Sequence, residues 1–588
     1  MIQLALPDGK VYVVDLFQPD GLTMLETMVP FIEDPEVQKI GHNLKFDLAW
    51  IAQASPSRLK PKAIFDTMIA SQLANAGYYR LVEAKKATKN KFKKARTGHS
   101  LKDLAQRHLG IVLDKGLQTS DWGGISLSQE QIRYAAEDAA ILIPLHQILV
   151  ELLTKNHLEK VAEVEFTTIP SIVEIELAGI PLDIKATKIL LDEKQMLART
   201  ILSTLQIEAQ KAGFVPRPKK GKKPQELLNP DSPMDVLDYL QGQGYEIDST
   251  GEAPLKELAN QGCTFAEHLL HYRRVRRQAT FLKDWLLKLS PADERLHPSY
   301  FQLGAESGRL TSRYPNGQQI PKRGDDGLQL RRLFRAGSGM KLIKADFSGI
   351  ELRIMARLSG DVMMIDAFQD GQDLHKLTAS KIAGIPVSEI TKEQRQGAKA
   401  VNFLLIYGGR PALLQERAKI GYGVDMTLEE AEDALKTFFR TYPGIERWHS
   451  GQRGLRHDPK NHWVHTYEEG FHHKLLVRSE TVLGRRRVWG WGPNKTLATV
   501  NQLYNSPSQG TGADLLKLSM AAVYDILPPE ARMIATVHDE VLLEVPEAQA
   551  EDIAQKVKAV MEKVGGDLLD PVPVEVEVDV VDTWGGDL

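Results

Sequence analysis

The sequence predicts a multidomain protein that combines the α/β and α+β classes. Its 588 residues exceed one ordinary domain and indicate two to four. Residues 1–155 alternate short apolar strands with helical stretches, as α/β domains do. From about residue 337, two strongly apolar strand segments stand far apart, and mostly helical sequence fills the space between them.

The first elements follow from local patterns. "MIQLALPDGKVYVVDL" predicts a strand, a turn and a strand, and it lacks the features of a signal peptide. "GHNLKFDLAWIAQ" opens a helix, and residues 126–153 predict one long helix with an apolar stripe. Residues 156–300 are mostly helical. "MKLIKADF" and "RMIATVHDEVLLEV" then predict a strand and a hairpin.

Composition excludes several classes of protein. The single cysteine, Cys263, excludes a disulfide framework and a cysteine-based zinc cluster, and it fits a reducing compartment, so we expect a cytoplasmic protein. No apolar run reaches the roughly 18 residues of a membrane span. The net charge of −3 gives no bulk sign of nucleic-acid binding, although an acidic total can hide a basic groove.

Three basic segments are candidates for such a groove. Lys85–Lys94 and Arg217–Pro224 are either solvated loops or contacts to an anionic partner. In "HYRRVRRQ" the arginines follow a helical pattern and could form a ridge that faces phosphates. These arginines are Arg273, Arg274, Arg276 and Arg277.

Acidic residues at strand ends are the first candidates for chemistry. Asp346 ends an apolar strand, before a helix that starts near Ser348; an N-cap role is the alternative. Asp539 and Glu540 are adjacent between two apolar strands, where a divalent cation would relieve their repulsion. An exposed turn is the alternative there, but the flanks are too apolar for it. These acids could meet on one sheet and hold two Mg²⁺ ions for phosphoryl transfer.

The segment "RQGAKAVNFLLIYGG" holds a second candidate site. Arg395, Lys399, Phe403 and Tyr407 are four residues apart, so on a helix they form one slowly winding stripe. Its cationic end suits a triphosphate and its aromatic end suits a sugar and a base. The alternative is an amphipathic helix with solvated cations and core aromatics.

Together these segments resemble family A DNA polymerases. "DFSGIELR", "RQGAKAVNFLLIYG" and "VHDE" are similar to motifs A, B and C of that family, in the same order. Ser307–Pro321 and Asn505–Lys517 resemble two further family segments, and the resemblance covers nearly the whole chain. It implies a right-hand polymerase domain at 156–588, with a thumb at about 190–300, a palm at about 301–360 and 495–588, and fingers at about 361–494.

The resemblance also implies roles at the reaction centre. Asp346 and Asp539, with the Phe347 carbonyl, would bind two Mg²⁺ ions, for which Mn²⁺ could substitute. Glu540 would support them. Glu351 would crowd a ribose 2′-hydroxyl and so select deoxynucleotides.

Substrate contacts follow from the same resemblance. The dNTP would be held by Arg395, Lys399, Phe403 and Tyr407, with His375 near its phosphates. Primer–template DNA would be contacted by Arg309, Asn505, Gln509 and His538, partly through the minor groove. We expect a monomer that has no membrane partner.

Four positions depart from the family pattern. Leu404 stands where glycine is usual and Gln396 where arginine is common. Gly349 replaces a glutamine, and Gly317 replaces a leucine. These changes concern fidelity and nucleotide selection, because none removes a metal ligand or a triphosphate contact.

Residues 1–155 resemble the family's RNase H-like 3′–5′ exonuclease domain. "NLKFD", ending at Asp47, and "YAAED", from Tyr134 to Asp138, match two of its acidic motifs, and "FDTMIASQLAN" from Phe65 also fits. The D-x-E pair of the first strand is missing. Either the natural start lies upstream, or the domain is degenerate. We expect weak or absent proofreading, and no 5′-nuclease domain.

Other functions compete with DNA polymerisation. A nuclease would use Asp47 and Asp138 but would leave over 400 residues unexplained. A non-catalytic DNA-binding scaffold has no reason to keep both the acids and the cationic stripe. An RNA polymerase or reverse transcriptase could use the same palm. Glu351 favours deoxynucleotides, whereas the template is not readable from the sequence.

Overall fold

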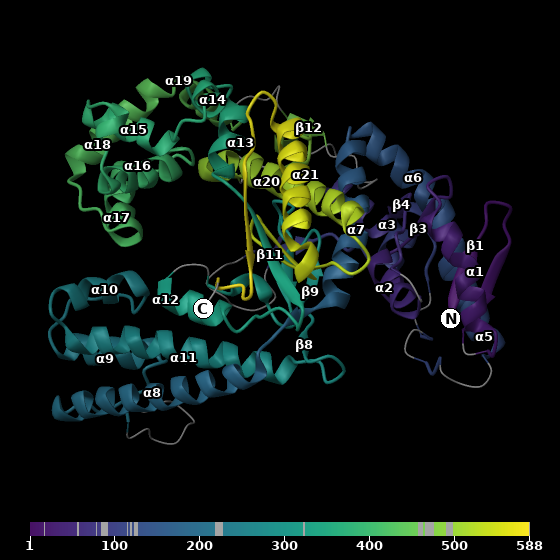
Figure 1. Ribbon diagram of the computed structural model, residues 1–588, viewed down its shortest axis with the longest axis horizontal. Coiled ribbons are helices and arrows are strands. Elements are labelled where there is room, and N and C mark those ends of the chain that lie inside the picture. The colour runs from purple at the N-terminus through teal and green to yellow at the C-terminus, as the bar shows by residue number, and fades with distance from the viewer. Residues whose placement is uncertain are drawn as a thin grey trace. The chain divides into compact units, whose positions relative to one another are not determined.

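The protein is described here from a computed structural model, whose elements Figure 1 shows. The described residues are 1–16, 18–55, 58–77, 79–83, 92–113, 116–117, 120–122, 127–217, 227–321, 324–456, 462–464, 475–489 and 498–586. They form two compact units. The first comprises 1–179, 298–319 and 338–582, and the second comprises 180–297, 320–337 and 583–588. Within these residues, no helix has the length and apolar character that a membrane crossing needs.

The first unit begins with small strands and surrounding helices. The predicted strand, turn and strand are confirmed as an antiparallel hairpin in which Ile2 pairs with Val14. A parallel strand pair, β3–β4, follows the hairpin. The elements are β1 Ile2–Ala5, β2 Val11–Val14, α1 Gly21–Glu33, β3 Lys39–Gly41, α2 Leu44–Ala54, β4 Ile64–Asp66, α3 Thr67–Asn75, β5 Tyr79–Glu83, β6 Phe92–Arg96, α4 Leu101–Leu104, α5 Gln129–Ala140 and α6 Leu142–Lys155.

The prediction of one long helix over 126–153 is wrong. Two helices, α5 and α6, meet at Ile141. Pro144 explains the break, because it has no N–H to donate to the Ala140 carbonyl and its ring would clash with that group. The apolar stripe nevertheless continues into α6, where Leu145, Leu149 and Leu153 are buried.

The second unit is mostly helical, as predicted. Its elements are β7 Ile180–Pro181, α8 Ile184–Lys211, α9 Pro233–Gly242, α10 Glu252–Asn260, α11 Thr264–Lys288, β8 Arg295–Leu296 and α12 Gly324–Arg331. The long helices α8 and α11 pack side by side around buried Leu205, Phe265 and Tyr272. Cys263 is buried and precedes α11 as its N-cap residue.

The predicted basic segments have different outcomes. On α11, Arg273 donates to the Thr250 carbonyl at 2.6 Å and Arg276 pairs with Asp231, so both already hold partners within this unit. A phosphate-facing ridge remains a prediction. Residues 84–91 and 218–226, which make up most of the other two basic segments, lie outside the described residues.

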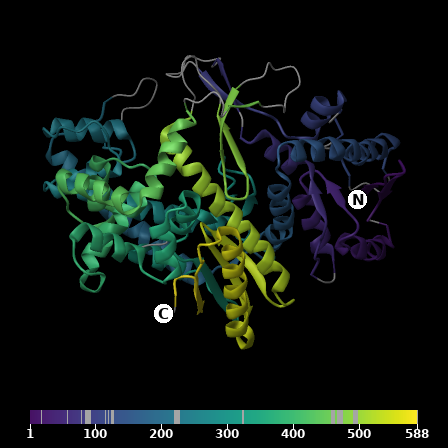
Figure 2. The same ribbon diagram turned by 90° about the horizontal axis from the view of Figure 1, so that it is seen from above.

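A four-stranded sheet forms the centre of the rest of the first unit, beyond its N-terminal elements. Its strand order is β15-β16-β11-β17, and all neighbouring strands are antiparallel. Figure 1 shows α21 beside this sheet, and Figure 2 shows the same helix, in yellow, next to α20. These elements are β11 Met340–Phe347, β15 Arg532–Val537, β16 Glu540–Pro546, β17 Val576–Val581, α20 Val500–Ile526 and α21 Ala550–Leu569. The predicted strand and hairpin are therefore confirmed.

The other elements of this unit connect to that sheet. They are α7 Glu159–Ala178, β9 Ser299–Phe301, β10 Thr311–Arg313, α13 Ile350–Ser359, α14 Val362–Gln369, α15 Leu374–Ala383, α16 Lys392–Leu405, α17 Pro411–Tyr422, α18 Leu428–Thr441, α19 Pro443–Gly454, β12 His462–Val464, β13 Leu475–Glu480 and β14 Arg486–Trp489. A continuous apolar core runs from the sheet through α13 and α20 into α15, α16 and α18.

Buried polar contacts join the N-terminal elements to the sheet. Arg58 pairs with Glu174 of α7 and donates to the carbonyls of Leu527 and Pro528, which follow α20. Glu174 in turn accepts from the Met533 N–H at 2.9 Å, at the start of β15. The N-terminal elements are thus tied directly to a strand of the central sheet.

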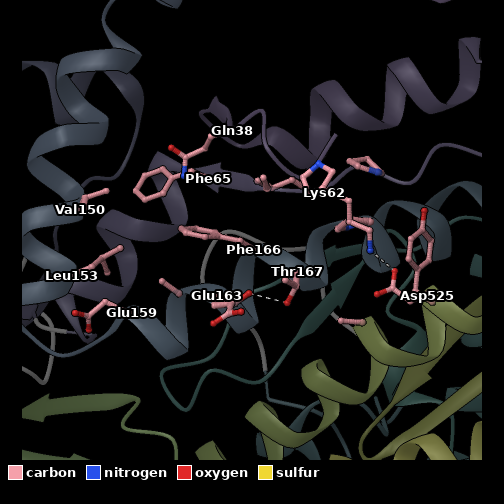
Figure 3. A pocket seen from close by; sticks show the side chains of 18 of the residues that line it. Gln38, Lys62, Phe65, Val150, Leu153, Glu159, Glu163, Phe166, Thr167 and Asp525 are labelled. Atoms are coloured by element: carbon pink, nitrogen blue, oxygen red, sulfur yellow. Dashed lines mark hydrogen bonds and ion pairs between the residues drawn. The ribbon is translucent and has the colours of Figure 1, made fainter. Parts of the chain in front are cut away.

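A cavity of about 500 Å³ lies beside this junction, and Figure 3 shows its lining. Phe65 and Phe166 contribute aromatic rings to it, 4.9 Å apart between centroids. At one end Lys62 pairs with Asp525 at 2.7 Å. Packing at this junction is therefore incomplete, and the polar contacts around the cavity join the N-terminal elements to the elements of the central sheet.

Candidate active site

The sheet brings the predicted acidic residues together. In the register of β11 and β16, Asp346 lies directly opposite Glu540. Asp539 precedes Glu540 in the tight turn that joins β15 to β16, where His538 has a φ of +58°. Directly opposed residues have Cβ atoms about 4.5–5.5 Å apart. The prediction that these distant segments meet on one sheet is therefore confirmed.

Helix α13 presents Glu351 close to this pair. The helix begins at Ile350 after Gly349, which has a φ of +60°. Because a side chain is strained in that conformation, glycine avoids a cost that a glutamine would carry on this backbone. Ser348 lies outside the helix and donates to Glu577 at 3.1 Å instead of capping it.

Four side chains converge around Glu351. The Tyr407 hydroxyl donates to the Glu351 carboxylate and lies 3.3 Å from the Ser508 hydroxyl. Burial raises the pKa of Glu351, and Asp539 raises it further by repulsion, whereas Tyr407 and the Arg309 cation oppose the rise. Burial and Glu351 together raise the pKa of Tyr407 well above its ordinary value. Glu351, the residue predicted to exclude ribonucleotides, thus lies within electrostatic reach of Asp539 and of Arg309.

The four-residue stripe is only partly helical. Helix α16 ends at Leu405, so Tyr407 lies in the following turn, and the prediction of one helical stripe is wrong at this residue. The Gly408 N–H donates to the Leu405 carbonyl and the Gly409 N–H to the Leu404 carbonyl, which is a Schellman ending. This ending turns Tyr407 toward Ser508 and Glu351.

Leu404 has a packing role in this ending. A Cβ atom at Gly409 would come within 2.2 Å of the Leu404 Cγ, so the leucine side chain covers the second glycine. Gly408 is left-handed, with a φ of +73°, and a Cβ there would lie 2.5 Å from the Tyr504 ring. Leu404, the departure from the family pattern, therefore pairs with a glycine that leaves room for it.

The cationic end of α16 packs against α15. Arg395 pairs with Asp373, the N-cap residue of α15, at 2.7 Å. His375 lies 2.9 Å from the Asn402 amide nitrogen, and its ring centroid is 5.6 Å from that of Phe403. Burial lowers the pKa of His375 to about 4, and the cations Lys399 and Arg395 also lower it, so the imidazole is neutral at pH 7.

The remaining predicted residues lie on one helix, in one loop and in one turn. Asn505 and Gln509 are both half-buried on α20 and stand one helical turn apart. Arg309 lies in the loop between β9 and β10, and His538 is exposed in the turn after β15. Sequence reasoning missed Asp373, which could have been found from its N-cap position. It also missed Asn402, which is fully buried and carries no pattern of its own.

The exonuclease-like residues lie on three elements, α2, β4 and α5. Asp47 lies on α2, where desolvation by the surrounding protein and repulsion from Asp66 raise its pKa to about 6. Asp66 is occupied as a cap, accepting from the N–H groups of Leu44 and Met68. Tyr134 lies on α5, where its ring centroid is 6.0 Å from that of Trp122. Asp138 follows one turn later on the same helix.

The donor set around Asp346 suits a hard divalent cation. Asp346, Asp539 and the Phe347 carbonyl all offer oxygen, the ligand that Mg²⁺ prefers. Asp539 also repels the Glu351 carboxylate, and a cation would relieve that repulsion. Among the described residues, no three His, Cys, Asp or Glu side chains gather as a closed metal site, so any metal here would also need ligands from water or substrate.

Comparison with protein families defines the class of protein. Residues 1–154 match the model of a 3′–5′ exonuclease, and residues 227–586 match that of DNA polymerase family A. The predicted order, an exonuclease domain followed by a polymerase domain, is confirmed. The protein is therefore a polymerase with an attached exonuclease-type domain.

Whole-chain relatives agree with this class. DNA polymerase I of Aquifex aeolicus is 32% identical over 99% of this chain and 92% of its own length. DNA polymerase I of Pseudomonas aeruginosa is 30% identical over 96% of this chain, which spans 58% of that longer protein. A solved structure, the POL domain of Pol1 from M. smegmatis in complex with DNA primer-template and dNTP, is 25% identical, with a TM-score of 0.76 over 99% of this chain and 92% of that one.

The chain belongs to DNA polymerase family A. It is a DNA-directed DNA polymerase, as the sequence predicted. Members of this family use divalent metal ions.

Proposed function

We propose that Asp346 and Asp539 form the nucleotidyl-transfer centre of this polymerase. The observation that carries the proposal is the strand register, in which Asp346 faces Glu540 and Asp539 occupies the adjoining turn. Asp346, Asp539 and the Phe347 carbonyl would hold Mg²⁺. When bound, two such ions stabilise the charge on the attacking and leaving oxygens of an in-line displacement. Glu540, which is almost fully buried, supports the turn that carries Asp539.

The triphosphate of the incoming dNTP is assigned to Arg395, Lys399 and His375. Arg395 is paired with Asp373. Binding of a triphosphate would exchange that carboxylate for phosphate oxygens, which accept bidentate hydrogen bonds from the guanidinium group. His375 is neutral, so its ring can donate one hydrogen bond without adding charge.

The nucleoside end is assigned to Phe403, Tyr407 and Glu351. Phe403 packs beside His375 and would meet the sugar, while the Tyr407 ring would meet the base. Glu351 is fixed by its hydrogen bond from Tyr407 and would occupy the space of a ribose 2′-hydroxyl. Selection of deoxynucleotides then depends on how firmly that carboxylate is held.

The primer–template is assigned to Arg309, Asn505, Gln509 and His538. Asn505 and Gln509 share one face of α20, where their amides can reach the acceptors that every base pair presents in the minor groove. The second unit is proposed as the thumb, and α14 to α19 as the fingers. We propose a monomer that works in the cytoplasm, where its single buried cysteine stays reduced.

The exonuclease-type domain is proposed to have at most weak proofreading activity. Asp66 is committed to backbone N–H groups, which leaves it few lone pairs for a metal. The attachment through Arg58 and Glu174 gives the domain a structural role that needs no catalysis.

A single reaction series tests both proposals. Labelled primer annealed to a DNA template is incubated with Mg²⁺ and either dNTPs or rNTPs, and a parallel tube receives no nucleotide. We expect extension with dNTPs, little with rNTPs, and an intact primer without nucleotide. Efficient rNTP extension would contradict the role of Glu351, and rapid 3′ shortening would contradict the weak exonuclease.

A further inference from the structure

Four charged side chains are buried together in the first unit, and none has a role in the site described above. Lys517 donates to the Glu165 carboxylate at 2.6 Å, and Arg485 bonds both Glu165 and Asp514. Glu165, Asp514 and Lys517 have no exposed surface, and Arg485 is 5% exposed. Burial raises the pKa of Glu165, but Lys517 and Arg485 outweigh that effect and hold it below the ordinary value. The cluster of Glu165, Arg485, Asp514 and Lys517 is called the buried ionic cluster below.

Stability alone is a weak reason for such a cluster. Replacing a buried ion pair with apolar side chains of similar volume is often neutral or stabilising, because desolvation offsets much of the attraction. The other contacts of the cluster are therefore informative. Lys517 also donates to the carbonyls of Gln302, at 2.9 Å, and Gly308, at 2.7 Å.

Those two carbonyls belong to one loop, residues 302–310, which joins β9 to β10. Gly308 has a φ of +86°, and a Cβ atom there would lie 2.8 Å from Arg485 Cδ. A Cβ atom at Gly510 of α20 would lie 3.3 Å from the Ser307 carbonyl oxygen. The loop is thus in close contact with both the Arg485 side chain and α20, with glycine at both points of close approach.

Arg309 follows the clamped Gly308 immediately in the chain. Its cation acts on the pKa values of both Glu351 and Tyr407, so it reaches the centre of the site. We propose that the buried ionic cluster is a positioning device, in which Lys517 and Arg485 fix the loop and thereby aim Arg309 at the growing end. The proposal rests on the role assigned to Arg309 above. Lys517 and Arg485 act through that residue and touch no substrate.

A double-mutant cycle separates positioning from simple support of the fold. The variants are Lys517→Met, Arg309→Ala and the combination of the two, assayed by single-nucleotide incorporation on primer–template DNA. If Lys517 acts through Arg309, Lys517→Met lowers the incorporation rate only in a protein that still has Arg309. Support of the fold would instead lower the rate in both backgrounds.

A matched control is a second buried ion pair whose acid also lies on α7. Arg58→Met breaks the ion pair to Glu174, which lies on α7 as Glu165 does and is also buried, but it leaves the 302–310 loop untouched. All variants are compared at a temperature at which each is folded by circular dichroism. If Lys517→Met does not fold, Glu165→Gln/Lys517→Met replaces it, because that pair leaves no uncompensated charge.

The expected values are specific. Arg309→Ala lowers the maximal incorporation rate by about 10²-fold, the effect of one lost transition-state donor. Lys517→Met lowers it by about 10-fold with little change in the Kd for dNTP, and by less than about 2-fold in the Arg309→Ala background. Arg58→Met leaves the rate within about 2-fold of the unmodified protein.

Two results overturn the proposal in distinguishable ways. Equal losses from Lys517→Met in both backgrounds, or an equal loss from Arg58→Met, would show that the cluster only supports the fold. A normal rate for Arg309→Ala would refute the role assigned to Arg309. The proposal that the buried ionic cluster positions this residue for catalysis would then fail as well.

Discussion

The hydrogen bond from Tyr407 to Glu351 leads to a specific prediction about sugar selection. Tyr407→Phe removes one hydroxyl and keeps the aromatic ring. Glu351 then loses the donor that stabilises its charged form, while burial and Asp539 continue to raise its pKa. The carboxyl therefore becomes protonated at a higher pH than in the unmodified protein, and it is no longer fixed in one orientation.

The size of the effect follows from the kind of bond that is lost. A hydrogen bond to a charged acceptor contributes about 1.5–3 kcal/mol. Discrimination against one small group by shape is worth about 1–3 kcal/mol, or roughly 10–200-fold. A Glu351 side chain that is less fixed discriminates less by shape. We therefore expect the preference for dNTP over rNTP to fall by about 10-fold in Tyr407→Phe.

The assay measures kcat/KM for one dNTP and for the matching rNTP between pH 6 and 9. Because a carboxyl loses its charge as the pH falls through its pKa, the preference in Tyr407→Phe should decline further toward pH 6. Tyr442→Phe also removes one tyrosine hydroxyl, which bonds Thr378, and it controls for general damage. A Tyr407→Phe protein with undiminished rNTP exclusion across this range would refute the reasoning.

Three further predictions concern other parts of the molecule. Phe403→Tyr adds a hydroxyl where the sugar 3′-position is expected, so it should relax discrimination against ddNTPs; equal incorporation ratios in the two proteins would place Phe403 elsewhere. Burial lowers the pKa of His375 from its ordinary value of 6.5 to about 4, so this residue reduces stability as the pH falls from 6.5 to 4. In His375→Gln the loss of unfolding free energy over that range should shrink by about 3 kcal/mol, and an unchanged urea-unfolding profile would contradict this. Arg58→Met leaves Glu174 buried without its partner and should lower the free energy of unfolding by about 3–5 kcal/mol, whereas Arg58→Met/Glu174→Met should lose less; equal losses would refute the pairing.

Local patterns were sufficient for the elements that carry the site. The apolar runs around Asp346 and Asp539 predicted both strands, and the antiparallel register then brought the acids together. The helical spacing of Arg395, Lys399 and Phe403 also matches α16. Such patterns succeed because each is decided by residues that are close in sequence.

Two mispredicted features had local signals that the spacing concealed, and one missed feature depends on a distant contact. Tyr407 continued the four-residue spacing, but the two glycines after it end the helix and turn its ring toward Ser508. The break at Ile141 depends on Pro144, which an apolar stripe conceals. The pairing of Lys517 with Glu165 joins residues far apart in the chain, and neither has a distinctive local pattern.

The central claim is that Asp539 is part of the nucleotidyl-transfer centre, and the rate of single dNTP incorporation by Asp539→Ala tests it most directly. The matched control is Asp579→Ala, on the same sheet, which removes a largely exposed carboxylate paired with Lys344. We predict that Asp539→Ala folds normally but loses at least about 10³-fold in rate with Mg²⁺, while Asp579→Ala stays within about 2-fold of the unmodified protein. Incorporation by Asp539→Ala at a rate comparable to Asp579→Ala would contradict the account.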